Sequence, residues 1–323
     1  MTRSAYRLIS AGLVFLSLSG ASLAQDAPGP QQPNAQDQQD VRLIYQFDQL
    51  DGHVATYRIQ TKLTQSKRVE GRVDVEDEQV KRDKTGVERG QGEAVSTTRQ
   101  TYELRFEQAE RGLGKVFMTP TRIEADLEEN GKVAYRYDSK EGRPPPERLQ
   151  PLTRQLGKTA VLTVTRQGEV KSVRGVKMSE RKAYKANFHK LPSKRLKIGR
   201  GWEQKTKQPI PPFGNLHYFT SFRLTSIKPA PQGAEGQRAE GLRIRVDAKL
   251  LVTYEGVGPT ASSRMKLTKQ EGGGHLVFDE RGLLVEEKLN STVELSIKAV
   301  AGSEVHTVKS QTVRWLSAFR KAK

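Results

Sequence analysis

The chain has 323 residues, with 55 Lys and Arg against 37 Asp and Glu, no cysteine and 35% hydrophobic residues. The apolar content is lower than in most soluble proteins but sufficient for a core, and it excludes a polytopic membrane protein. The lack of cysteine excludes a disulfide scaffold, a thiolate metal site and a cysteine nucleophile.

Residues 1–24 have the features of a signal peptide. Arg3 and Arg7 form a positive start, a short apolar stretch follows, and Ser22-Leu23-Ala24 supplies small residues for cleavage. The apolar stretch is too short for a spanning helix, and no other stretch of about 20 apolar residues follows. We therefore predict a periplasmic or secreted protein without a transmembrane span or lipid anchor, its mature chain carrying a net charge of +16 from Gln25 onward. The alternative is an uncleaved N-terminal anchor.

Residues 25–40 are rich in Gln, Pro, Asp and Asn and contain almost no apolar residue. Such a segment cannot bury enough surface to offset its chain entropy, so we expect a disordered tether. Residues 41–320 follow as a single β-rich domain, with a possible division into two halves near residues 140–157.

Apolar and polar residues alternate over much of this domain. The pattern is clear over residues 57–63, 102–107, 242–250 and 293–299. Period two buries one face of a strand and leaves the other in water, which is typical of antiparallel sheets. Several of these strands are long, and long, twisted antiparallel strands tend to curl. The predicted fold class is mainly β (α+β), a curved antiparallel sheet or half-barrel with one or two short covering helices.

Three segments have the pattern of a hairpin, in which a strand, a polar turn, a glycine and a second strand follow one another. The glycines are Gly131, Gly168 and Gly282, and each supplies the positive φ that a tight turn requires.

Two short helices are predicted between the strands. The first has leucines at helical spacing over residues 149–156, after a stiff Arg-Pro-Pro-Pro link. The second runs from residue 180 to about 190 and ends at Leu191-Pro192. Its apolar stripe consists of Tyr184, Phe188 and Leu191.

The second helix lies in a strongly basic segment. Between Lys171 and Lys207 there are thirteen basic residues against Glu180 and Glu203 alone, a local balance of +11. Lys and Arg beside an apolar stripe suit an anionic membrane surface or another polyanion. The predicted anion-binding patch consists of Arg181, Lys182, Lys185, Lys190, Lys194, Arg195, Lys197 and Arg200.

The same pattern fits a helix whose outer face is simply solvated by lysines, and this interpretation stays open. Nucleic acid is a weaker partner, because aromatic residues do not interleave with the cations as a stacking platform requires. The predicted export also places the chain outside the cytoplasm, away from nucleic acid.

No motif argues for catalysis or for a metal. No two of the five histidines have metal-ligand spacing, and the sequence has neither GxSxG nor a phosphate-binding GxxxxGK[ST] loop. We therefore predict a non-catalytic protein without a cofactor or metal.

The chain resembles a secreted bacterial β-sheet domain of unknown function. Leu191-Pro192 and Gly199-Arg200-Gly201-Trp202 are similar to its Leu-Pro…Gly-x-x-Trp step, and Leu43-Ile44-Tyr45-Gln46-Phe47 to its first strand. The hairpins and covering helices resemble, more distantly, the periplasmic lipoprotein-carrier half-barrels. The carrier resemblance implies an apolar concave sheet that shields acyl chains under a helical lid. That family does not require a lid as basic as residues 171–207.

On this resemblance, the leading hypothesis is an envelope protein that holds an acyl, lipid or lipoprotein ligand, or an anionic envelope polymer. The aromatic residues expected on its apolar face are Tyr57, Tyr102, Phe106, Tyr135, Tyr137, Tyr184, Phe188 and Trp202. Large apolar residues are also ordinary core residues. The alternatives are therefore a structural or protein-interaction module with a self-filled core, and a hydrolase of an envelope polymer.

Overall fold

The computed structural model describes residues 40–70, 92–185, 188–210, 213–230, 241–256, 265–299 and 302–322. The predicted signal peptide and residues 25–39 of the predicted tether lie outside the described residues, as does the side chain of Lys182.

Strands account for most of the described chain. They are β1 (His53–Glu70), β2 (Gly92–Gln108), β3 (Leu113–Glu129), β4 (Lys132–Asp138), β5 (Ala160–Thr165), β6 (Val170–Arg174), β7 (Gly201–Ile210), β8 (Gly214–Pro229), β9 (Leu242–Gly256), β10 (Met265–Asp279), β11 (Leu284–Ala299) and β12 (Gly302–Lys321). The helices are α2 (Phe47–Leu50), α3 (Gln150–Thr153) and α4 (Arg181–Lys185), with 3₁₀ turns η3 (Glu110–Gly112), η4 (Ser139–Glu141) and η5 (Glu147–Leu149).

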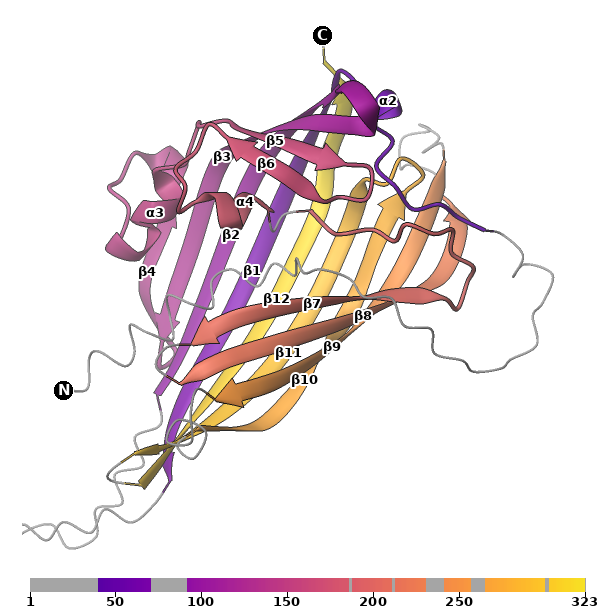
Figure 1. Cartoon of the computed structure of the whole chain (residues 1–323). Helices are drawn as coiled ribbons and strands as arrows, with labels where there is room; N and C mark the ends of the chain where they lie inside the picture. Colours follow the sequence, from indigo (N-terminus) through magenta and orange to yellow (C-terminus); the bar gives the residue numbers. More distant parts are fainter. Residues whose placement is uncertain are drawn as a thin grey trace, which may run out of the picture.

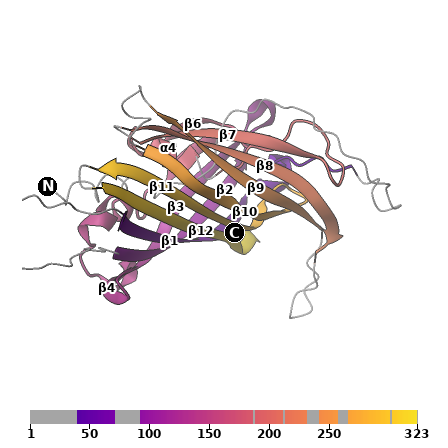
Figure 2. The same cartoon turned by 90° about the horizontal axis from the view of Figure 1, so that it is seen from below.

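All these strands form one antiparallel sheet. Its order is β6-β5-β3-β2-β1-β12-β11-β10-β9-β8-β7, and β4 pairs with β3 beside this path. Because β6 and β7 stand at opposite ends of the order, the sheet stays open. It curls strongly, so that β7 and β8 lie across the concave side from β1 and β12 (Figure 1 and Figure 2). The predicted class, a curved antiparallel sheet or half-barrel with short helices, is confirmed.

The predicted strands and hairpins are also confirmed. The four alternating segments lie inside β1, β2, β9 and β11, and the three hairpins join β3 to β4, β5 to β6 and β10 to β11. Gly131, Gly168 and Gly282 have φ angles of 76°, 79° and 79°, a region that glycine enters without the steric cost of a Cβ.

The main core fills the concave side between the sheet and two segments outside it. We call these the N-terminal segment (residues 41–50) and the strap (residues 188–198). Phe47 and Leu50 of the N-terminal segment and Phe188 and Leu191 of the strap are buried in the same cluster as the sheet side chains. Two smaller clusters exist. One is formed by residues of β8, β9, β10 and β11, and the other lies beneath α3.

The predicted helices are shorter than expected. The second was predicted over residues 180–190, but α4 ends at Lys185, and Phe188 and Leu191 lie on chain without helical structure. The backbone here bonds to the sheet instead, since the Leu191 N–H donates to the Gln167 carbonyl at 2.8 Å. The first is divided into η5 and α3 and ends before Leu156.

Candidate functional site

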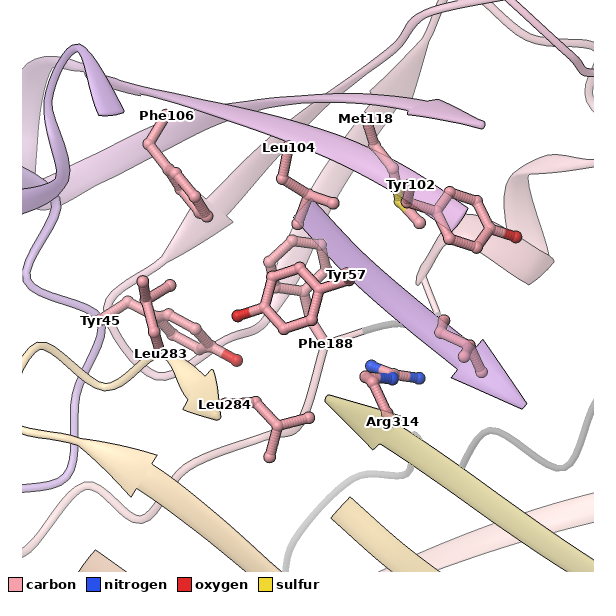
Figure 3. A pocket seen from close by; sticks show the side chains of 11 residues that line it. Tyr45, Tyr57, Tyr102, Leu104, Phe106, Met118, Phe188, Leu283, Leu284 and Arg314 are labelled. Carbon is pink, nitrogen blue, oxygen red and sulfur yellow. The ribbon is translucent and has the colours of Figure 1, made fainter. Parts of the chain in front are cut away.

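An aromatic pocket lies on the concave face beneath the strap and the N-terminal segment (Figure 3). The residues that line it are Tyr45, Tyr57, Ile59, Tyr102, Leu104, Phe106, Met118, Phe188, Leu283, Leu284 and Arg314. Arg314 is the one charged residue in this lining. The unfilled space is about 30 Å³, which is room for about one or two water molecules.

Strand register explains why these side chains converge. Tyr57 of β1 is paired with Tyr102 of β2, and Leu104 of β2 is paired with Met118 of β3. Residues directly opposite in an antiparallel pair point to the same face of the sheet, and residues two apart share that face. Alternation in three neighbouring strands therefore builds one continuous apolar surface, of which Phe106 is the next member.

The strap and the N-terminal segment meet each other over this surface through an aromatic contact. The ring of Tyr45 stacks with that of Phe47 at a centroid distance of 6.0 Å, and it meets the ring of Phe188 edge-on at 5.9 Å. The two segments also join each other, because Val41 and Leu196 exchange backbone hydrogen bonds of 2.9 and 2.8 Å. They form one cover over the pocket.

Only a few polar contacts fix the strap to the sheet. The carbonyl of Lys190 accepts hydrogen bonds from Trp202 Nε1 at 3.1 Å and from Gln204 Nε2 at 2.5 Å, both on β7. At the opposite side of the strap, the turn between β5 and β6 approaches closely, and a Cβ on Gly168 would lie 2.1 Å from the His189 carbonyl oxygen. The strap therefore runs in a narrow passage between β7 and this turn.

A buried cluster of ionisable side chains anchors the strap to the floor of the sheet. Glu287 of β11 and Arg314 of β12 are paired in register, and His189 Nε2 of the strap lies 2.9 Å from Glu287 Oε2. Arg314 Nε lies 3.7 Å from the same oxygen. Burial alone would raise the pKa of Glu287, but the charges of Arg314 and His189 outweigh it and hold the pKa at about 2. Glu287 is therefore a carboxylate at neutral pH.

The structure brings four of the predicted aromatic residues together in the pocket, namely Tyr57, Tyr102, Phe106 and Phe188. Tyr184 and Trp202 belong to the same apolar cluster without lining the pocket, and Trp202 stacks on Phe222 at 4.9 Å.

Tyr135 and Tyr137 were predicted on the same apolar face, but they lie apart from the pocket. They pack in the small cluster with Ile123, Leu149 and Leu152. The reason is that α3 covers this part of β3 and β4 and separates it from the rest of the concave face.

The basic residues of the predicted patch lie on the chain between β6 and β7. Lys190 is half-buried, and the exposed members are Arg181, Lys185, Lys194, Arg195, Lys197 and Arg200. Met178 stands in the same stretch with 83% of its surface exposed.

A second hollow of about 30 Å³ lies further along the concave face and has a different chemistry. Its lining residues are Thr220, Ala248, Leu250, Gly273, Leu289, Asn290, Ser291, Ser310 and Thr312. No charged side chain is among them.

Sequence reasoning did not assign seven lining residues of the aromatic pocket to a site, namely Tyr45, Ile59, Leu104, Met118, Leu283, Leu284 and Arg314. Tyr45 carried a usable signal, since it lies in the apolar run Leu43–Phe47 before the first long strand. Arg314 carried none, because nothing local distinguishes a buried arginine from the many exposed ones.

No protein-family profile matches the sequence, and no curated protein matches it significantly. Five chains of solved structures match the fold. One comes from a structure described as "lipid-protein interactions in lipovitellin", with a TM-score of 0.43 and 12% identity. The alignment covers 84% of this chain and 26% of that chain, so the protein spans about a quarter of its length.

Two further observations concern the described residues alone. None of their helices is long and apolar enough to cross a membrane. Within the same ranges, no three His, Cys, Asp or Glu side chains are grouped so as to hold a metal ion.

Proposed function

We propose that the protein binds the acyl chain of a lipid or lipoprotein on the concave face of its sheet, without catalysing a reaction. One observation carries the proposal: an aromatic-lined surface is covered by two segments that do not belong to the sheet. Tyr45, Phe47 and Phe188 of the cover are buried in the same apolar cluster as the sheet side chains, and Tyr45 and Phe188 line the pocket.

An acyl chain would take the place of part of this cover. The unfilled space of about 30 Å³ is far below the several hundred Å³ of a typical ligand pocket, so binding requires the strap to move. Burying a side chain such as Phe188 contributes about 1.5–3 kcal/mol. Burying a few methylene groups of a ligand contributes a similar amount, which offsets the displacement of the Phe188 side chain.

The proposal also covers the location of the protein and the role of its basic patch. We infer export after cleavage of residues 1–24, and we infer that the basic patch meets the anionic headgroups of a membrane or an anionic envelope polymer. The exposure of Lys194, Arg195 and Lys197 supports this role. Each cation near an anionic lipid surface contributes on the order of 1 kcal/mol.

The second candidate function is a structural or protein-interaction module with a self-filled core. The small unfilled space favours it, because the side chains of the cover already occupy most of the pocket.

Mass spectrometry of an organic extract from natively purified residues 25–323 separates the two. Stoichiometric acyl species in the extract support the lipid-binding function. If well-folded protein gives an empty extract and also takes up no acyl ligand when one is offered, the self-filled module is the correct account.

A variant of the strap sharpens this test. Phe188→Ala removes a side chain that competes with the ligand, so we expect it to bind diphenylhexatriene, a fluorescent hydrocarbon, several-fold more tightly than the wild type. The matched control is Phe219→Ala, which removes the same side chain from the outer face of β8, where Phe219 contacts Lys205. Equal binding by both variants would contradict a site beneath the strap.

A further inference from the structure

A belt of neutral polar side chains crosses the concave face beside the aromatic pocket. On β12 the two sites adjoin, because Arg314 lines the pocket and Thr312, two residues away on the same face, lines the second hollow. Two residues along a strand span about 6.6 Å. From Thr312 the belt continues through Ser310 and Ser291, whose hydroxyl oxygens lie 2.7 Å apart.

Three consecutive glycines lie at the centre of the belt. Gly272, Gly273 and Gly274 stand in the middle of β10, and Gly273 lines the hollow. A Cβ on Gly274 would lie 1.8 Å from the Lys288 carbonyl oxygen, and one on Gly273 would lie 2.6 Å from that of Ala248. Glycine inside a strand weakens it and often marks a bend or the close approach of a ligand. Here the close approach is that of the backbones of β9 and β11, which leave no room for a Cβ at Gly273 or Gly274.

Four buried polar atoms at the β7–β8 end of the belt have no hydrogen-bond partner among the described residues. They are Gln204 Oε1, Thr206 Oγ1, Tyr218 OH and Thr220 Oγ1. The register pairs Gln204 with Thr220 and Thr206 with Tyr218, so the four atoms belong to one patch of the concave face. Gln204, Tyr218 and Thr220 are each only 1% exposed. A buried polar group without a partner costs about 1–3 kcal/mol, so four together indicate something that they bind.

The chemistry of the four atoms defines the complementary group. Gln204 Nε2 already donates to the Lys190 carbonyl, so Gln204 Oε1 is left as an acceptor. The hydroxyls of Thr206, Tyr218 and Thr220 can each donate or accept. Burial raises the pKa of Tyr218, which keeps this hydroxyl protonated. With no charged side chain in the lining of the hollow, an ionised group would be desolvated without compensation.

We propose that this belt is a subsite for the neutral, oxygen-rich linkage of an amphiphile, a glycerol acyl ester. Its ester carbonyl accepts hydrogen bonds from Tyr218 and Thr220, and a glycerol hydroxyl donates one to Gln204 Oε1. The inference rests on the proposed function, because the acyl chain of the same molecule occupies the adjoining aromatic pocket. Both a membrane lipid and the lipid-modified end of a lipoprotein contain this ester.

Two probes on residues 25–323 test the subsite separately from the pocket. Diphenylhexatriene has no polar atom and reports the pocket alone, and monodecanoylglycerol displaces it and reports the pocket together with the belt. We expect Tyr218→Phe and Thr220→Val each to weaken monodecanoylglycerol about three- to tenfold, the loss of one neutral hydrogen bond. Their affinity for diphenylhexatriene should not change. Thr253→Val, on the outer face of β9, is the control and should behave as the wild type.

The thermal stability of the variants without ligand supplies an independent readout. Removing a buried hydroxyl that has no partner should stabilise the unliganded protein, so we expect the Tm of Thr220→Val to rise by about 2 °C. Ordered water in the belt would instead leave monodecanoylglycerol affinity equal in all variants, and that result would overturn the subsite alone. A wild type that takes up no diphenylhexatriene would overturn the proposed pocket.

A last comparison distinguishes the two sources of the ester. A lysophospholipid and a diacylated lipopeptide are each tested for displacement of the probe. Binding of either one with the same sensitivity to Thr220→Val supports the subsite and identifies the source. Displacement by both without that sensitivity would contradict it.

Discussion

At the scale of single residues, we predict that neutralising Glu287 strongly destabilises the folded protein. Its carboxylate faces Arg314 and His189 in a buried setting, and breaking a buried ion pair by neutralising one partner costs about 3–5 kcal/mol. We expect Glu287→Gln to lower the free energy of unfolding by that amount in urea denaturation. The control is Glu286→Gln, whose side chain is 51% exposed beside His275, and we expect it to stay within about 0.5 kcal/mol of the wild type.

The same carboxylate predicts a pH dependence. The pKa of Glu287 falls from 4.5 to about 2 on folding, so its stabilisation is complete above about pH 4.5 and is lost as the pH falls toward 2. Asp138 also has a pKa of about 2, owing to its hydrogen bond with Arg122, and it contributes to the same acid loss. The informative quantity is therefore the stability difference between the wild type and Glu287→Gln, which should shrink over this window. Parallel stability curves would show that the cluster does not hold Glu287 charged.

Among the elements, the strap depends on the turn between β5 and β6. Gly168 and Gly131 have φ of 79° and 76°, so alanine is strained to a similar extent at both, by about 1–3 kcal/mol. Only at Gly168 would the new Cβ meet a backbone atom, the His189 carbonyl oxygen at 2.1 Å, whereas at Gly131 nothing lies within 4 Å. We expect Gly168→Ala to lower the Tm clearly more than Gly131→Ala. Hydrogen exchange of the Leu191 amide should also speed up only in Gly168→Ala, and equal rates in both variants would contradict the close approach.

Elements that depend on local pattern could be predicted from the sequence. The alternation around Tyr57 and Tyr102 fixes which face of β1 and β2 is buried, and the three turn glycines fix their hairpins. The length of α4 could not be predicted, because Leu191 is held by a bond to Gln167 of another turn, which no local pattern reveals. The spacing of Phe188 and Leu191 fits a helix that continues to residue 190, but it also fits two buried residues on a non-helical segment held by tertiary contacts.

The residues of the candidate site could likewise be predicted only in part. Tyr57, Tyr102 and Phe106 were expected because aromatic residues at alternating positions share a face, and Phe188 was expected from the apolar stripe of the predicted helix. Arg314 was not, since its burial depends on Glu287 of the neighbouring strand. The polar belt left one trace, the run Gly272-Gly273-Gly274 inside a long strand. Its hydroxyl residues come from β7, β8, β11 and β12 and are adjacent only because of the strand order.

At the scale of the whole molecule, the exposed cations of the basic patch lie beside the cover of the pocket. The concave side of the curled sheet holds the main core, the pocket and the belt, while the exposed cations of the basic patch lie on the chain that crosses from β6 to β7. That chain includes the strap, which itself carries Lys194, Arg195 and Lys197. A surface that touched the patch would therefore act next to the cover of the pocket, which suits delivery of a ligand from that surface.

This arrangement predicts binding to anionic vesicles that depends on salt. Because the patch cations are exposed, their attraction to a lipid surface is screened by salt, with a Debye length near 10 Å at about 0.1 M and well below that at about 0.5 M. We expect residues 25–323 to float with anionic vesicles at low salt and to be released near about 0.5 M salt. Lys194→Gln, Arg195→Gln and Lys197→Gln together should abolish most of this flotation.

The control has the same net charge but leaves the patch intact. It combines Lys132→Gln, Arg136→Gln and Lys140→Gln, three exposed positions in and next to β4, and it should float as the wild type does. If both triple variants lose flotation equally, overall charge and not the patch causes binding. If the wild type floats equally with neutral vesicles, the contact is apolar, and Met178, the most exposed large hydrophobic side chain of the described chain, is then the residue to replace first.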